Sequence, residues 1–268
     1  MSLSDELLAI PGDFLRLKLC RYGPMLYLSN DLFIGRSLDR YGEFSEGEME
    51  LFRQIVERGQ VVVDAGANIG THTVFFAQTM GPGGAVFSFE PQRLIFQVLC
   101  ANAALNGLSN VFPFHAAAGR ERGVACVPAL DPAAPQNFGA VSLRGARGGD
   151  RVRMMTIDEL GLAACHLIKI DVEGMERDVM AGAEQTIARL RPFLYLENEH
   201  DEKPGELIGV LFDLGYRLYR HVTPMFRPDN FFGDRENVLG RVSSFNVLGI
   251  PQSRPQSVQG LPEITASA

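Results

Sequence analysis

VVVDAGANIGTHT, residues 61–73, is the stretch that decides the fold of this 268-residue chain. Three consecutive valines are typical of a parallel strand that is covered on both faces, because such a strand needs no alternation of polar side chains. Gly66 and Gly70 then allow a sharp turn in which a ligand can approach the backbone. The stretch therefore predicts a buried strand, a glycine turn and a helix over residues 71–80.

A second strand, residues 86–89, ends at Glu90, which follows Gly70 by twenty positions. An acid at this distance is where nucleoside-binding folds hold a ribose, because one carboxylate can accept hydrogen bonds from both hydroxyls. Further strands are predicted within residues 111–115, 166–174 and 192–200, with helices between them. This alternation predicts an α/β fold with a largely parallel sheet.

The glycine pattern separates two classes of cofactor. Dinucleotide-binding folds use G-x-G-x-x-G, in which helix amides bind a pyrophosphate. This chain instead reads D-x-G-x-N-x-G from Asp64 to Gly70, with Asn68 in the slot of the second glycine. An acidic loop suits a cationic amino-acid group better than a diphosphate. A nicotinamide-dependent dehydrogenase is therefore disfavoured, and an ordinary tight turn followed by an unrelated acid is the structural alternative.

Composition limits the class of protein and its partners. Hydrophobic residues make up 46% of the chain and charged residues 21%, which is a globular balance. The formal net charge of -7 argues against a nucleic-acid partner. The four cysteines form no metal-type pairs, and no apolar run approaches the length of a membrane span. We expect a cytoplasmic protein without integral membrane association.

Outside the sheet-and-helix alternation, three segments stand apart. Residues 1–40 contain turn residues between short apolar pieces and predict a small N-terminal hairpin, after which the main domain occupies residues 41–250. Residues 120–155 are rich in Pro and Gly and predict hairpins or a flap across the sheet edge. Residues 251–268 are rich in Ser, Pro and Gln and predict a disordered tail.

Ser45 and Glu48 match a capping box at the start of a helix over residues 46–57.

Together these features resemble the S-adenosylmethionine site of class I methyltransferases. Over residues 20–250 the chain resembles the FkbM family. The resemblance is carried by Gly42-Glu43, residues 63–70, Phe89-Glu90-Pro91, Asn137-Phe138-Gly139, Thr156-Ile157-Asp158 and residues 168–174. It implies a Rossmann-like class I methyltransferase fold, with seven mostly parallel strands, one of them antiparallel, and helices on both faces. It also implies S-adenosylmethionine as cofactor and a hydroxyl of a sugar, glycolipid or natural product as methyl acceptor.

The same resemblance assigns the cofactor site. The glycine loop would surround the methionine part, small residues after the third strand would admit the adenine ring, and the turn at Glu43 would lie near the amino group. Alternatively, Glu43 is only a favourable charge at a helix N-terminus. The assigned residues are Glu43, Asp64, Gly66, Asn68, Gly70, Thr71, Glu90, Pro91, Ala117 and Asp171.

Acids after the later strands are the candidates for chemistry. Methyl transfer to a hydroxyl needs alignment of the acceptor and a base for its proton. His200 is favoured as that base because histidine titrates near neutrality, with Asp171, Glu173 and Glu197 as alternatives. Asp171, Glu197 and Asn198 also resemble the magnesium ligands of catechol-type O-methyltransferases, although the FkbM resemblance does not require a metal.

Several alternatives stay open at this point. The chain could bind the cofactor without turnover and serve as a scaffold, or it could methylate an amine, which needs less help from a base. The acceptor is a small molecule or a glycan whose identity the residues do not specify. The oligomeric state, including a homodimer, is equally open.

Overall fold

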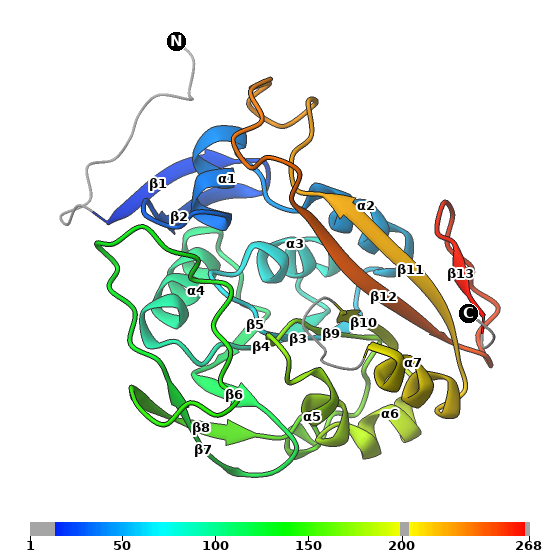
Figure 1. Cartoon of the computed structure of the whole chain (residues 1–268). Helices are drawn as coiled ribbons and strands as arrows, with labels where there is room; N and C mark the ends of the chain where they lie inside the picture. Colours follow the sequence, from blue (N-terminus) through cyan, green and yellow to red (C-terminus); the bar gives the residue numbers. More distant parts are fainter. Residues whose placement is uncertain (1–13, 199–203, 266–268) are drawn as a thin grey trace.

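The computed structural model describes residues 14–198 and 204–265. They form a central sheet between two layers of helices, a hairpin at the N-terminal side and a second, smaller sheet (Figure 1). The helices are α1 (Ile34–Tyr41), α2 (Glu46–Ile55), α3 (Thr71–Met80), α4 (Arg93–Leu105), η1 (Asp158–Leu160), α5 (Glu176–Ala181), α6 (Glu184–Leu190) and α7 (Pro204–Asp213). The strands are β1 (Leu15–Cys20), β2 (Gly23–Leu28), β3 (Val61–Ala65), β4 (Ala85–Phe89), β5 (Val111–Phe114), β6 (Ala116–Ala118), β7 (Gly123–Val127), β8 (Asp150–Met155), β9 (Leu167–Ile170), β10 (Phe193–Glu197), β11 (Tyr216–Pro224), β12 (Ser243–Pro251) and β13 (Glu263–Ile264).

The central sheet has the strand order β13-β11-β12-β10-β9-β3-β4-β5. β10, β9, β3, β4 and β5 are mutually parallel, whereas β12 is antiparallel to both of its neighbours, β10 and β11. Apart from β13, this is the seven-stranded, mostly parallel sheet that the sequence predicts, and the predicted fold class is confirmed. The short strand β13 pairs antiparallel with β11 and adds an eighth strand.

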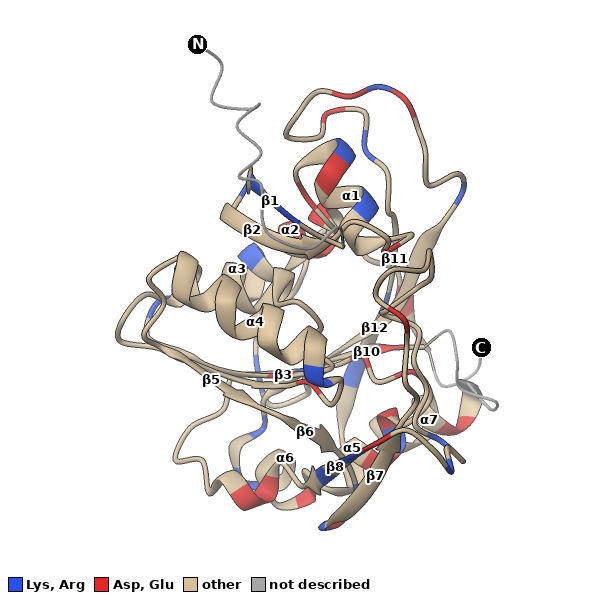
Figure 2. Ribbon diagram, turned by 90° about the vertical axis from the view of Figure 1, so that its left-hand side faces the viewer, with Lys and Arg blue, Asp and Glu red and all other residues tan. Residues whose placement is uncertain are grey.

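The valine run places β3 in the middle of the core. Val62 and Val63 are both fully buried, but Val62 packs in the hydrophobic cluster on one face and Val63 in the cluster on the other. Neighbouring strand residues point to opposite faces, so a strand that is covered on both sides needs apolar residues at every position. Figures 1 and 2 show α3 and α4 on one face and α5, α6 and α7 on the other.

Two segments differ from their predicted form. The tail after Pro251, for which disorder is predicted, contains β13 and the buried side chain of Val258. The helix predicted from Met175 is two short helices, α5 and α6. They are separated near Gly182, where a β-carbon would lie 2.0 Å from the backbone oxygen of Gly119. Close approach of another backbone therefore interrupts the helix.

The segments around the main domain also form regular structure. β1 and β2 form an antiparallel hairpin, but the apolar residues after it begin α1 instead of a further strand. Within residues 120–155, β7 and β8 pair antiparallel, and β8 pairs in parallel with β6. Among the described residues, no helix has the length and apolar character that crossing a membrane requires.

The predicted capping box at the start of α2 is wrong. Ser45 has a φ of 54° and makes no side-chain hydrogen bond to the helix. The Glu48 side chain does not return to the N-cap but contacts His72, Ser244 and Asn246. Tertiary partners that are far away in sequence therefore replace the local hydrogen bond that the spacing suggests.

Candidate active site

A cavity of about 340 Å³ lies at the carboxyl edge of the central sheet. Its lining includes residues at or after the ends of β3, β4, β9 and β10, together with parts of α2, the start of α3 and the start of β12. Open α/β sheets bind ligands at this edge. The volume falls within the range of small-molecule sites.

The glycine loop forms one wall of this cavity. Gly66 has a φ of 80°, and a β-carbon on it would lie only 1.7 Å from the backbone oxygen of Asp171. Gly66 and Asn68 line the cavity, and Asn68 adopts a φ of 50° without being glycine. Gly70, with a φ of 89°, packs against Leu99 and ends the loop at the N-cap of α3. The loop therefore needs its glycines for close backbone approach and for its left-handed conformation.

The Glu90 carboxylate is buried and faces the cavity. One oxygen accepts a hydrogen bond from the Asn68 amide at 3.0 Å and the other from the Gln92 amide at 2.8 Å. Burial, with the nearby carboxylates of Asp64 and Asp171, raises the pKa of Glu90 to about 8 despite these two bonds. Each oxygen can accept one more hydrogen bond, so the carboxylate can bind a ribose diol.

The raised pKa of Glu90 gives a testable dependence of stability on pH. Between pH 4.5 and about 8 the unfolded chain loses the Glu90 proton while the folded chain keeps it. Stability should therefore fall as pH rises through this window, with a limiting slope of about 1.4 kcal/mol per pH unit. Denaturant unfolding of Glu90→Gln should lack this contribution, so that its stability relative to the unaltered protein increases with pH. If the stabilities of the two proteins change with pH in the same way, the raised pKa of Glu90 is contradicted.

Asp64, which the sequence assigns to the cofactor, does not line the cavity. It is completely buried behind the loop and accepts a hydrogen bond from the Thr73 hydroxyl at 2.7 Å. The Lys169 ammonium lies 3.7 Å from Asp64 and 3.1 Å from Asp171. Burial lowers the pKa of Lys169, but the carboxylates of Asp171, Asp64 and Glu48 outweigh burial, and the net shift is upward. Asp64 therefore acts within the protein, as one partner of a buried cation.

Lys169 lines the cavity and is a residue that the sequence analysis missed. The available signal was one charged residue in the otherwise apolar strand β9, which has Leu167, Ile168 and Ile170 as its other members. A fully buried lysine is rare unless it is paired. Such a residue in a central strand indicates carboxylate partners nearby.

Three acids that the sequence proposes for chemistry do come together. Side-chain oxygens of Asp171, Glu173 and Glu197 lie within 4.8 Å of one another, and all three residues line the cavity. Burial raises the pKa of Glu197, and the negative charges of Asp171 and Glu173 raise it further. Among the described residues, one Glu197 oxygen and the Asn198 side-chain oxygen are buried without a hydrogen-bond partner.

The sequence also proposes Asn198 and His200. His200 lies outside the described residues, and Asn198 does not line the cavity. The third member of the cluster is therefore Glu173, whereas the resemblance to a magnesium site predicts Asn198.

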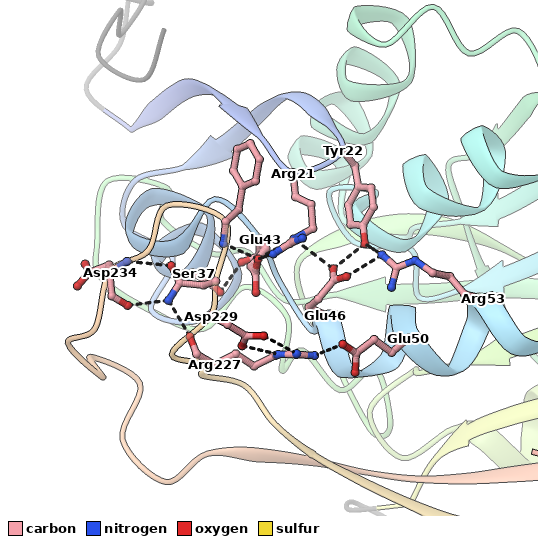
Figure 3. A network of polar contacts seen from close by, with 12 residues as sticks. Arg21, Tyr22, Ser37, Glu43, Glu46, Glu50, Arg53, Arg227, Asp229 and Asp234 are labelled. Carbon is pink, nitrogen blue, oxygen red and sulfur yellow. Dashed lines mark hydrogen bonds and ion pairs between the residues drawn. The ribbon is translucent and has the colours of Figure 1, made fainter. Parts of the chain in front are cut away.

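The structure places Glu43 away from the cavity. Its carboxylate contacts the Arg21 guanidinium at 2.7 Å and accepts a hydrogen bond from the Phe231 amide at 2.7 Å. Figure 3 shows this carboxylate in a polar network that also includes Glu46, Arg53 and Arg227. The network ties the N-terminal hairpin to α2 and to the segment between β11 and β12. Glu43 therefore connects elements of the fold and is not among the residues that line the cavity.

Pro91, Ala117 and Thr71 also line the cavity, whereas Gly70 does not. Pro91 follows Glu90, and Ala117 lies in β6 beside Ala118 and packs in a cluster that includes Leu143. Thr71 begins α3. The cavity thus combines the Glu90 side chain with apolar side chains that include Ala117 and Ala118. These residues therefore fit S-adenosylmethionine.

Comparison with known proteins finds relatives among methyltransferases. The family model of the methyltransferase FkbM domain matches residues 64–218. The 31-O-demethyl-FK506 methyltransferase FkbM of Streptomyces tacrolimicus is 29% identical over 237 residues, covering 76% of this chain and 86% of that protein. The hexuronic acid methyltransferase AglP of Haloferax volcanii is 26% identical over 200 residues, covering 71% of this chain and 78% of that protein.

A solved structure is also similar. The crystal structure of the methyltransferase FkbM from Methylobacillus flagellatus has a TM-score of 0.49 and 20% identity, covering 72% of this chain and 43% of that chain. The stronger finding is the family model, which spans more than half of the residues and begins within the glycine loop. The chain belongs to the FkbM family of S-adenosylmethionine-dependent methyltransferases.

Proposed function

We propose that this enzyme methylates a hydroxyl of a sugar, a glycolipid or a hydroxylated natural product. The observation that carries the proposal is the single cavity that combines Glu90 at a nucleoside end with the acids Asp171, Glu173 and Glu197. A hydroxyl acceptor needs such a base, whereas an amine needs less help. The relatives support the substrate class, since their names describe methylation of a demethylated FK506 and of a hexuronic acid.

The residues divide into two groups by role. Glu90 would accept hydrogen bonds from the ribose hydroxyls, and Gly66 and Asn68 would let the cofactor approach the loop backbone. When bound, S-adenosylmethionine supplies a methyl group on a positively charged sulfur. The protein would orient the acceptor oxygen and remove its proton.

Glu197 is the base that we favour among the described residues. One of its oxygens is buried without a partner in the described part of the chain, so it can contact the acceptor hydroxyl. Its raised pKa makes the ionised form a stronger proton acceptor and moves the ionised fraction to alkaline pH. Asp171 is less suitable because Lys169 donates a hydrogen bond to it at 3.1 Å. His200 stays a prediction from the sequence.

A divalent cation is the alternative use of the acid cluster. Carboxylate oxygens of Asp171, Glu173 and Glu197 are hard ligands of the kind that magnesium prefers. A bound cation would also neutralise the repulsion that raises the pKa of Glu197. If a cation binds here, magnesium should strengthen the binding of S-adenosylhomocysteine to the cavity.

Calorimetric titration with S-adenosylhomocysteine, with and without magnesium, tests the proposal. We expect micromolar binding, which Glu90→Gln should weaken because a glutamine side chain has only one acceptor oxygen and cannot accept hydrogen bonds from the ribose hydroxyls at both terminal atoms. A change of affinity on adding magnesium would favour the cation alternative. Absence of binding in both buffers would reject the function, and a titration with NADH serves as the control for a dehydrogenase.

An acceptor panel separates the remaining alternatives. Methyl transfer to sugar or natural-product hydroxyls supports the proposal, and transfer to amines alone would make the protein an N-methyltransferase. Tight cofactor binding without turnover on either class would favour a scaffold. A cytoplasmic location and the lack of a nucleic-acid partner stay predictions from composition and net charge.

A further inference from the structure

Glu48 and His72 form a buried ionisable pair on the cavity wall. Glu48 lies in α2 and His72 is the second residue of α3, and their side-chain atoms Oε2 and Nε2 are 2.9 Å apart. The other Glu48 oxygen accepts hydrogen bonds from the Ser244 hydroxyl at 2.7 Å and from the Asn246 amide at 3.1 Å. Both members of the pair are more than nine-tenths buried, and both line the cavity.

The Glu48 carboxylate is ionised. Burial raises its pKa, but the hydrogen bond and charge of His72, the charge of Lys169 and the Ser244 hydroxyl lower it to about 2. Replacing a buried ion pair with apolar residues often leaves stability unchanged or improves it. A contribution to stability therefore does not explain the Glu48–His72 pair. Because both residues line the cavity, the pair is placed to contact a bound ligand.

Two of the acids that the sequence assigns to the cofactor, Asp64 and Glu43, do not line the cavity. Asp64 is turned inward to Thr73 and Lys169, and Glu43 is bound to Arg21. Both acids are thus occupied away from the cavity. The ammonium and carboxylate of the methionine part need other residues on this wall.

The Glu48–His72 pair offers both charges. Among the described residues that line the cavity, the basic side chains are Lys169 and His72, and Lys169 is already bound between Asp171 and Asp64. His72 Nδ1 has no hydrogen-bond partner within the described part of the chain, whereas Nε2 contacts Glu48. The N-terminus of α3 also lies at the cavity, because its first residue, Thr71, lines it. The N-cap residue, Gly70, has no side chain that could cap the free amides of this helix end. This helix end attracts a carboxylate.

We propose that Glu48 and His72 bind the amino-acid end of S-adenosylmethionine. His72 donates one hydrogen bond from Nε2 to Glu48 and one from Nδ1 to the cofactor carboxylate. The remaining lone pair of Glu48 Oε2 accepts a hydrogen bond from the cofactor ammonium. The inference rests on the proposed function, because it assumes that this cavity binds the cofactor.

Two ligands that differ only in this end provide the test. S-adenosylhomocysteine carries the amino-acid end, and 5′-methylthioadenosine has the same adenosine and thioether without it. We expect His72→Phe and Glu48→Gln to weaken S-adenosylhomocysteine about tenfold to a hundredfold, the loss typical of one hydrogen bond to a charged group. The affinity for 5′-methylthioadenosine should change by less than about twofold, which also shows that the variants are folded.

His221→Phe is the matched control. His221 is a buried histidine that contacts the Tyr195 hydroxyl at 2.9 Å and does not line the cavity, so this variant should bind both ligands as the unaltered protein does. Equal weakening of both ligands by His72→Phe, or no weakening of either, would overturn this inference while leaving the proposed function intact. Failure of the unaltered protein to bind either ligand would overturn both.

Discussion

Gly66→Ala should lose detectable S-adenosylhomocysteine binding and should lower the free energy of unfolding by about 3 kcal/mol or more. The new β-carbon would lie 1.7 Å from the Asp171 backbone oxygen, so the loop or β9 must move. The φ of 80° adds about 1–2 kcal/mol of strain for any residue with a β-carbon. Overpacking adds about 1–3 kcal/mol more. Calorimetry and denaturant unfolding measure the two effects.

Gly59→Ala separates strain from the steric clash. Gly59 has a φ of 78°, almost that of Gly66, but nothing lies within 4 Å of the position that its β-carbon would occupy. This variant should therefore show only the backbone strain of about 1–2 kcal/mol and unchanged ligand binding. If both variants behave alike, the close approach of Gly66 to Asp171 has no role in the site.

Lys169→Met should destabilise the protein by about 3–5 kcal/mol at neutral pH. The substitution retains much of the side-chain volume but leaves Asp64, which is fully buried, without its cation. Removal of one member of a buried ion pair is costly in this range because the other charge remains without compensation. Denaturant unfolding at neutral pH measures the loss.

The double variant Asp64→Asn/Lys169→Met provides the control. If the cost arises from an unpaired carboxylate, removing that charge should recover a large part of the lost stability, since the Thr73 hydroxyl still has a hydrogen-bond acceptor. Additive losses in the double variant would show instead that Lys169 contributes through packing alone.

The sequence correctly predicts the strand, the glycine turn and the placement of Glu90 at the end of β4, because these depend on local geometry. A strand covered on both faces must be apolar throughout, and β3 obeys this rule at Val62 and Val63. Strand ends in a parallel sheet meet at one edge, and therefore Asp171, Glu173 and Glu197 come together as expected. The break between α5 and α6 could not be predicted, because it arises from contact with Gly119, far away in the chain.

By itself, the sequence determined the order of strands and helices, the sheet edge that carries the site and the position of Glu90. Only the tertiary structure decided which charged side chains face the cavity. Asp64 and Lys169 lie on adjacent strands, and the sequence favours the acid, but the lysine is the one that lines the cavity. Glu48 meets Ser244 across 196 positions, whereas the nearby Glu43 turns to Arg21. Spacing along the chain specifies where a residue sits on its element, but the direction of a buried charge depends on partners that only folding brings within reach.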